Sequence, residues 1–259
     1  RDRLRSRGLG DVYKRQIESI AKIDKDLLYR CYNTFYNLNN MVIAVAGNFD
    51  VDKTLEICDE LLKPSKDHGL QVIVPDEPLT VHEKRNVQKL SCAIPLFNIG
   101  WKFPAYSGKE QLEKYIVYNI LMELCLGRTS DFYNRMYEDG LLNDAFNVGV
   151  FCGRGFFSVI ADGESTDPDK VLSEIEKELF RLRKEGLDED EFITIRNKTY
   201  GELVAGFNNV ESVANAMISQ EINDVGIYDG IEITANTTFA DIKSALDDFD
   251  IENLSLIHI

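Results

Sequence analysis

Residues 148–161 read VGVFCGRGFFSVIA, and this stretch decides the fold class. Val148–Cys152 and Phe156–Ala161 are short apolar runs joined by Gly153-Arg154-Gly155, a pattern typical of a β-hairpin. Two glycines around an arginine are also compatible with an anion-binding nest, but the strand-like runs on both sides favour the turn. The stretch therefore predicts two antiparallel strands.

Helical patterns lie on both sides of this hairpin. Each begins at a capping residue or ends at a glycine, and most of them place apolar residues three or four apart. The predicted helices are Glu110–Leu126 before Gly127, Ser130–Asp139 before Gly140, Asp167–Lys184 with proline at its first position, one helix of some thirty residues from Asp188 to about Asn223, and Phe239–Phe249.

The first part of the chain repeats the alternation of helix and strand. Asp24–Tyr36 and Val51–Leu62 are predicted helices, and Met41–Ala46 (MVIAVA) is a predicted buried strand between them. A polar, proline-containing stretch follows and predicts an interdomain linker over residues 67–88. After it, Lys89–Lys102 predicts a pair of strands, with Pro95 at an edge or a bulge.

The order of these elements predicts an α+β fold, with a mostly antiparallel sheet and helices packed on one of its faces. We expect two domain portions. Residues 17–66 end a first domain, and residues 89–253 form most of a second. The helix layout before residue 41 recurs before residue 254, which indicates a repeated α/β unit.

The two ends of the chain are related at the level of DNA. One coding of Asp11–Gln16 (DVYKRQ) is the reverse complement, over eighteen bases, of a coding of Leu254–Ile259 (LSLIHI). This relation predicts that residues 1–16 and 254–259 derive from sequencing adapter and not from the gene. The second domain would then lack its last strand, and we expect residues 17–253 alone to aggregate or to stay partly unfolded.

The charge of the chain excludes some partners. The net charge is −15, and it becomes −19 without residues 1–16, which carry six basic and two acidic side chains. Such a charge opposes binding to nucleic acid or to an anionic membrane. The aromatic side chains of Tyr32, Phe35, Tyr36, Phe156 and Phe157 are accordingly predicted to serve the core and the sheet surface, not base stacking.

Five cysteines, at positions 31, 58, 92, 125 and 152, are scattered and form no CxxC pair. They fit a reducing compartment better than a disulfide framework, so we expect a cytoplasmic protein. Cys152 ends an apolar run without a nearby histidine, which favours a packing role over a nucleophile. The acidic run Asp188–Glu191 has metal-ligand chemistry, but as a helix start it is explained by capping.

Several segments together resemble the insulinase/pitrilysin zinc metallopeptidases, or inverzincins, in a bacterial branch similar to processing peptidases. These segments are LYRCYNTFYNLNNM (28–41), MVIAVAGNFDVDKTLEIC (41–58) and LGRTSDFYNRMYEDGLL (126–142), followed by the hairpin and the helices described above. The likeness spans residues 17–253, and the succession of segments carries it. It implies the repeated α/β domain of that family.

The resemblance also implies where zinc binds. In the family, two histidines of an H-x-x-E-H helix and a downstream glutamate hold zinc, and the intervening glutamate activates water. Those residues belong before the start of this chain. The sequence offers His68, His82 and His258, none of them in that spacing. We therefore expect no catalytic residue and no metal in this chain, with zinc in the intact parent.

Some members of the family hold the substrate carbonyl with an arginine and a tyrosine in an L-R-x-x-x-G-L-x-Y segment. The matching stretch here is one residue shorter, and Tyr137 and Asn143 stand in the positions of that arginine and tyrosine. The departure weakens the expectation that this domain assists catalysis.

Three functions follow as hypotheses. The first is a portion, inert alone, of a peptidase that encloses peptides in a chamber; its partners would be a peptide substrate and the missing N-terminal catalytic domain. The second is a structural or partner subunit of the same family that never had the zinc motif. The third is a free-standing peptide-binding module. The upstream DNA separates the first two.

Overall fold

The structure is a computed structural model, and it describes residues 20–67, 69–74, 78–89, 91–249 and 253–258. It divides into two compact units, residues 1–73 and 74–259. The division falls within the stretch predicted as a linker. Predicted features at residues 1–19 and at His68 lie outside the described residues.

The first unit contains α3 (Lys25–Phe35), the short 3-10 helix η1 (Leu38–Asn40) and α4 (Val51–Leu61). The aspartates expected as caps do begin the two long helices: Asp24 accepts a hydrogen bond from the Leu27 amide at 2.8 Å, and Asp50 accepts one from the Lys53 amide at 3.0 Å. Both helices were predicted from these local signals.

Asn37 ties this unit together. It is 7% exposed, its amide donates to the carbonyl of Lys66 at 2.9 Å, and its side-chain oxygen accepts from the Ser65 hydroxyl at 3.0 Å. The segment after α4 is thereby fixed to the turn after α3.

The predicted strand Met41–Ala46 is not formed among the described residues. This segment has no strand partner there, and Val42 and Ile43 are 42% and 60% exposed. A strand exists only through its hydrogen-bonded neighbours, so an apolar run by itself does not form one.

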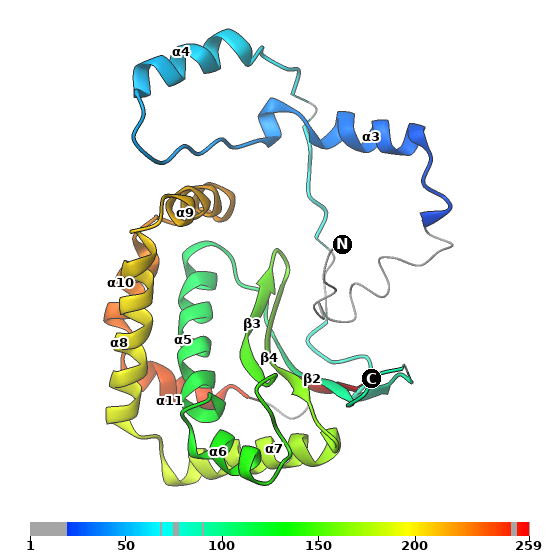
Figure 1. Cartoon of the computed structure of the whole chain (residues 1–259), viewed down its shortest axis with the longest axis vertical. Helices are drawn as coiled ribbons and strands as arrows, with labels where there is room; N and C mark the ends of the chain where they lie inside the picture. Colours follow the sequence, from blue (N-terminus) through cyan, green and yellow to red (C-terminus); the bar gives the residue numbers. More distant parts are fainter. Residues whose placement is uncertain (1–19, 68, 75–77, 90, 250–252, 259) are drawn as a thin grey trace. The chain divides into compact units, whose positions relative to one another are not determined.

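The second unit is built on a five-stranded sheet with the order β1-β5-β2-β4-β3 (Figure 1). The strands are β1 (Arg85–Val87), β2 (Leu96–Phe103), β3 (Asn147–Gly153), β4 (Phe156–Glu164) and β5 (Leu254–His258). The predicted hairpin is confirmed: β3 and β4 pair antiparallel from Asn147↔Asp162 to Gly153↔Phe156, and Gly155 takes a φ of 84° in the turn.

The predicted strand pair at Lys89–Lys102 is corrected in its partners. β1 lies before Lys89 and pairs in parallel with β5, while β2 pairs antiparallel with β4 and β5. β1 and β2 are therefore separated by β5. Pairing between distant segments is decided by the whole sheet, and local pattern does not encode it.

The open edge was predicted for residues 17–253 alone, and for that shorter chain it stays a prediction. Leu254–His258 fills the place of the last strand, with Leu254 and Leu256 only 6% and 1% exposed. The physical reason is the alternation in LSLIH, which puts both leucines on one face of a pleated strand. The adapter origin of residues 254–259 is a separate matter and stays a prediction.

The helices of the second unit are α5 (Gly108–Leu126), α6 (Asp131–Glu138), α7 (Pro168–Glu185), α8 (Glu189–Gly206), α9 (Val210–Asn223), α10 (Asp229–Asn236) and α11 (Phe239–Asp247). α5 packs on β3 and α7 on β2, while α8, α10 and α11 pack against α5 (Figure 1). Alternate residues of β2 are buried and the others are half-buried, as expected for a sheet with helices on one face.

The prediction of a single helix from Asp188 to Asn223 is wrong, because α8 ends at Gly206 and a separate helix, α9, begins at Val210. Asn209 caps α9 by accepting a hydrogen bond from the Ser212 amide at 2.9 Å. Asn at a cap competes with helical continuation by bonding the backbone itself. α10 was not predicted, and α11 begins with a capping box between Thr238 and Asp241.

One hydrophobic core lies between the sheet and the helices. Its largest fully buried side chains include those of Tyr118, Phe132, Phe157, Phe192 and Ile99. Of the aromatics assigned to the core and the sheet surface from sequence, Phe157 is 0% exposed, which agrees with that prediction. Tyr32, Phe35 and Tyr36 are 56%, 57% and 65% exposed, so the prediction is wrong for these three in the described structure. Of the helices in the described part of the chain, none combines the length and the apolarity needed to cross a membrane.

Candidate functional site

The segment from α6 to the start of β3 holds the two positions singled out from sequence. α6 begins at Ser130, whose hydroxyl accepts a hydrogen bond from the Tyr133 amide at 3.1 Å. It ends at Glu138; beyond it Gly140 takes a φ of 70°, and the Leu141 amide donates back to the Met136 carbonyl at 2.9 Å. This left-handed end favours glycine and turns the chain sharply after one short helix.

Tyr137 and Asn143 both lie next to Tyr133. The ring centroids of Tyr137 and Tyr133 are 5.9 Å apart, and the Tyr133 hydroxyl donates to the Asn143 carbonyl at 3.4 Å. Tyr137 is 51% exposed. The Asn143 side chain is engaged at both ends: its amide donates to Glu164 at 3.0 Å, and its oxygen accepts from the Ala145 amide at 2.8 Å.

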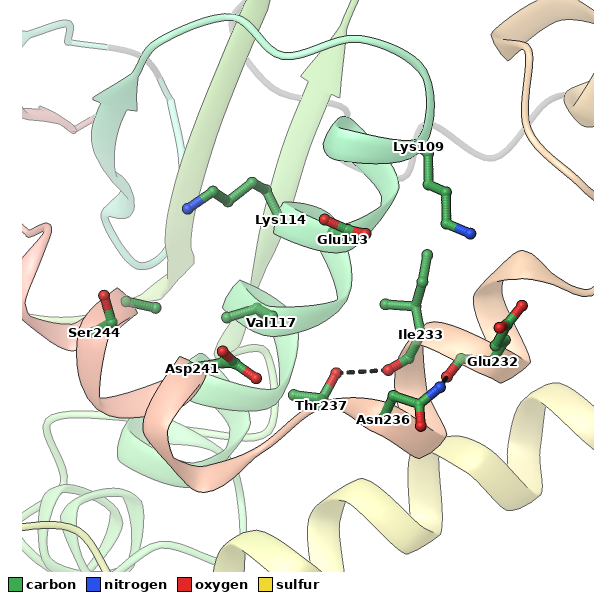
Figure 2. Close-up of a pocket in the computed structure, with 11 residues that line it drawn as sticks. Lys109, Glu113, Lys114, Val117, Glu232, Ile233, Asn236, Thr237, Asp241 and Ser244 are labelled. Atoms are coloured by element: carbon green, nitrogen blue, oxygen red, sulfur yellow. Dashed lines mark hydrogen bonds between the residues drawn. The ribbon is translucent and has the colours of Figure 1, made fainter.

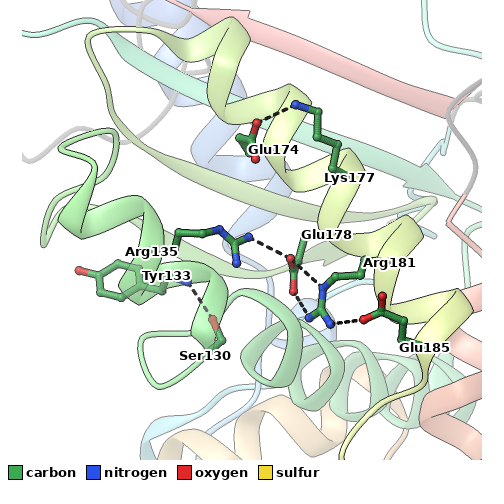
Figure 3. A network of polar contacts seen from close by, with 8 residues as sticks. All are labelled: Ser130, Tyr133, Arg135, Glu174, Lys177, Glu178, Arg181 and Glu185. Carbon is green, nitrogen blue, oxygen red and sulfur yellow. Dashed lines mark hydrogen bonds and ion pairs between the residues drawn. The ribbon is translucent and has the colours of Figure 1, made fainter.

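An ionic network fixes α6 to α7 (Figure 3). The Glu178 carboxylate is 4% exposed, and it accepts hydrogen bonds from Arg135 of α6 at 3.0 Å and from Arg181 at 2.6 Å. Burial raises the pKa of Glu178, but the hydrogen bonds from Arg181 and Arg135 outweigh it and leave that pKa below the usual range. Glu178 is therefore an ionised, fully partnered group that holds the α6 segment in place.

A cavity of about 480 Å³ lies among α5, α10 and α11 (Figure 2). Its walls carry charges of both signs, from Lys109, Glu113, Lys114, Glu232 and Asp241. The sequence did not reveal this cavity, because α10, which forms one wall, was not predicted.

Most polar groups around this cavity are already engaged. The Thr237 hydroxyl donates to the Ile233 carbonyl at 2.8 Å, and the Asn236 amide donates to the Glu232 carbonyl at 2.9 Å. Lys114 Nζ lies 5.7 Å from the centre of the Tyr106 ring. The residues that line the cavity include no histidine and no cysteine, so the hydroxyls of Ser244 and Thr237 have no imidazole base beside them in its walls.

The thiols of Cys125 and Cys152 are unsuited to catalysis. Burial raises the pKa of Cys125, which is 2% exposed. Burial also raises the pKa of Cys152, an effect that a hydrogen bond from Gln111 at 3.5 Å opposes. A raised pKa keeps a thiol protonated and unreactive, so the packing role predicted for Cys152 is the better interpretation.

The other two chemical alternatives also have structural explanations. Asp188 caps α8 by accepting from the Glu191 amide at 2.9 Å, as expected of a helix start. Arg154, in the turn of the hairpin, donates to the Ile222 carbonyl at 3.2 Å. Neither geometry indicates a metal or an anion site.

Comparison with known proteins decides the family. The family model described as the peptidase M16 inactive domain matches residues 22–199, which is more than half of the chain. The chain belongs to the peptidase M16 family. The resemblance to insulinase-like enzymes found in the sequence is thereby confirmed, and the matched region is the family's inactive domain.

Relatives and solved structures agree with this assignment. The uncharacterized zinc protease YmfH of Bacillus subtilis is 27% identical over 239 residues, which cover 89% of this chain and 55% of that protein. A putative M16-like peptidase from Alicyclobacillus acidocaldarius superposes with a TM-score of 0.84 at 24% identity, over 94% of this chain and 59% of that one. A protease from Helicobacter pylori gives 0.81 at 13% identity, over 94% and 60%.

At these identities the structural likeness establishes the fold. The mixed α/β architecture with a mostly antiparallel sheet, predicted from sequence, is the M16 fold. The chain spans a little over half the length of these relatives. It is thus a non-catalytic portion of an M16 zinc-protease relative, as the sequence predicted.

The described residues do not fit a zinc site. Within the part of the chain that the structure describes, no three His, Cys, Asp or Glu side chains gather as a metal would require. His82 lies exposed outside the helices and strands, and His68 and the His258 side chain lie outside the description. No catalytic step through zinc is assigned to residues of this chain.

Proposed function

We propose that this chain is the non-catalytic half of a zinc peptidase, inert alone, that helps to enclose peptides in a chamber when the parent protein is intact. The observation that carries the proposal is the match of residues 22–199 to the M16 inactive domain. The likeness to the zinc protease YmfH over only 55% of its length supports a parent with a further catalytic portion.

The first unit supports a missing partner domain. In α3, the side chains of Leu28, Tyr32 and Phe35 are 60%, 56% and 57% exposed; in α4, those of Leu55 and Leu61 are 58% and 69% exposed. Apolar faces of this extent are stable when another element covers them. We assign the cover to the N-terminal catalytic domain of the parent.

The chemistry then belongs to that domain. There, an H-x-x-E-H helix and a downstream glutamate would hold zinc, which would supply an activated water for peptide hydrolysis. This chain would contribute the wall of the chamber, and its substrate would be a peptide.

Tyr137 and Asn143 fit a wall better than a catalytic aid. The exposed Tyr137 ring is free to contact a peptide, but it carries no positive charge for a carbonyl. The Asn143 amide donates to Glu164, and its oxygen accepts from the Ala145 amide. We infer that this segment shapes the chamber without polarising the substrate.

That same departure favours a second candidate, a non-catalytic subunit that completes an assembly with a homologous partner and never had a zinc motif. Cys31, Cys58, Cys125 and Cys152 are free thiols in the structure and support a cytoplasmic setting for either candidate.

Recovery of the upstream coding sequence is the test. The first proposal expects an H-x-x-E-H helix there with a downstream glutamate, and expects the complete protein to hydrolyse peptides until a chelator removes the metal. Replacement of the motif's glutamate by glutamine should abolish hydrolysis while zinc stays bound. An upstream domain without the motif would refute the peptidase and support the subunit.

A further inference from the structure

β5 lies in a slot between β1 and β2, two strands that are far from it in the sequence. On one side it pairs in parallel with β1, where Arg85 faces Leu256 and Val87 faces His258. On the other side it pairs antiparallel with β2, from Phe97↔His258 to Trp101↔Leu254. The occupant is thus bonded through its backbone along both edges.

Contacts to the main chain hold the occupant on the β1 side. The Leu256 amide donates to the Lys84 carbonyl at 3.0 Å, and the Ser255 hydroxyl donates to the Glu83 carbonyl at 2.7 Å. Backbone bonding of this kind accepts any residue with a free amide and an extended conformation, which excludes proline and little else.

Side-chain selection is limited to two positions. Leu254 and Leu256 are buried against the core, while Ser255 and Ile257, on the opposite face of the strand, are half-buried. Trp101 pairs opposite Leu254 and is buried in the same region. The Phe249 ring is buried there too, with its centroid 5.3 Å from that of the Trp101 ring. The slot therefore selects most strongly for aliphatic side chains at the positions of Leu254 and Leu256.

The identity of the seated segment agrees with such loose selection. Leu254–His258 is part of the six residues whose coding is complementary to that of Asp11–Gln16, and a gene origin is not expected for it. It nevertheless pairs with β2 over Leu254–His258 and with β1 over Leu256–His258. Such a segment fits because the slot selects only for an extended backbone and for aliphatic side chains at alternate positions.

We propose that the slot between β1 and β2 is a strand acceptor, which binds an extended peptide in trans when the peptide carries aliphatic residues at alternate positions and β5 is displaced. Recognition is by strand addition, in which main-chain bonds supply affinity and two apolar pockets supply selectivity. β1 has no described strand partner other than β5, so the occupant also decides whether residues 85–87 join the sheet.

The test uses the full chain with the double substitution Leu254→Asp/Leu256→Asp, which places two carboxylates where the core is apolar and so unseats β5. The probe is the fluorescein-labelled peptide NLSLIHI. The matched control peptide, LLNSIIH, has the same composition but no two aliphatic residues at alternate positions. Fluorescence anisotropy measures binding, and hydrogen exchange of Arg85–Val87 and Leu96–Phe103 locates it.

We expect NLSLIHI to bind the double variant at least about tenfold more tightly than LLNSIIH does, because only the first can bury two aliphatic side chains at alternate positions. We also expect it to bind the variant at least about tenfold more tightly than the unaltered chain, whose slot is filled. Bound NLSLIHI should slow exchange in β1 and β2. Equal binding of the two peptides, equal binding to the two chains, or binding without protection of β1 and β2 overturns the proposal.

A variant that does not fold by itself gives an equally clear result. Refolding it with NLSLIHI, but not with LLNSIIH, should then restore a cooperative thermal transition and the protection of α7, which lies outside the slot. Recovery with neither peptide, or with both alike, refutes the strand acceptor.

Discussion

Arg135 Nη2 of α6 lies 3.0 Å from Glu178 Oε2 of α7, and it joins two helices whose paired residues are 43 positions apart in sequence. The carboxylate is buried and the guanidinium is half exposed. The pair therefore fixes the α6 segment, with Tyr137 at its end, to the body of the second unit.

Removal of both arginines should leave the buried Glu178 carboxylate without its ion-pair partners. We expect Arg135→Met/Arg181→Met to lower the free energy of unfolding by about 3–5 kcal/mol, because Glu178 keeps its burial and loses its partners. Lys177→Met is the matched control, since it removes an exposed pair with Glu174 and should cost about 0–1 kcal/mol. Urea denaturation measures both. Equal losses in the two variants would show that the network contributes nothing beyond surface charge.

The Glu178 carboxylate should also make the free energy of unfolding depend on pH in the acid range. The pKa of Glu178 is lower in the folded state than in the unfolded state, so its contribution is complete above the unfolded pKa and disappears as the pH falls through the folded pKa. We expect Glu178→Gln to lose less stability than the unaltered chain between about pH 6 and pH 3. Urea titrations over this range decide it, and parallel curves would contradict the assignment.

Tyr118 should make the free energy of unfolding depend on pH in the alkaline range. It is buried, its hydroxyl donates to Asp248 at 2.9 Å, and burial together with the Asp248 charge raises its pKa. Folding stability is then complete below the unfolded pKa of about 10 and is lost as the pH rises above it.

We expect Tyr118→Phe to cost about 1 kcal/mol at neutral pH and to flatten the loss above about pH 10. Tyr115→Phe, at a residue that is 42% exposed, is the control and should change neither value. Thermal melts across pH give both readings. An alkaline slope that Tyr118→Phe leaves unchanged would rule out this tyrosine as the cause.

Gly127 should tolerate no side chain. A Cβ at this position would lie too close to the Glu123 carbonyl of the preceding helical turn, whereas at Gly100 the nearest atoms are 3.9 Å away. We expect Gly127→Ala to destabilise the chain by about 1–3 kcal/mol and Gly100→Ala to be near neutral. Differential scanning calorimetry compares the two, and a neutral Gly127→Ala would show that the end of α5 adjusts freely.

Zinc should neither bind tightly nor matter to the isolated chain. We expect equilibrium dialysis to leave the chain and its His82→Ala variant with equally little zinc, because His82 lies exposed and the described residues gather no ligand set. A chelator should not shift the thermal transition. Stoichiometric, tight zinc uptake, or peptide cleavage that a chelator abolishes, would overturn the assignment of this chain as non-catalytic.

The parts of the fold that sequence predicted are those with local causes. Asp167 followed by Pro168 opens α7, and Asp188 caps α8, because a cap bonds an amide three residues away. The β3–β4 hairpin needs only its turn and two adjacent apolar runs. The family resemblance was carried by a succession of such local segments.

The candidate sites were predictable to a smaller extent. Sequence placed Tyr137 and Asn143 at the α6 segment, but it did not reveal that Asn143 is bonded to Glu164 or that Glu178 is the buried partner of Arg135. The α5–α10–α11 cavity was missed as well. These contacts join helices and strands whose relative positions depend on packing of the whole unit.

The sequence by itself determined the hairpin and most of the helices with their caps, though not α10 or the break between α8 and α9, because these features rest on residues close together in the chain. It also determined the net charge, which is a sum over residues, and membership of an insulinase-like family, which a succession of local segments carries. Only the tertiary structure decided that Met41–Ala46 stays unpaired among the described residues and that Leu254–His258 lies between β1 and β2. A strand requires neighbours on its edges and a core under one face. Both come from distant segments, so neither can be inferred from the strand's own residues.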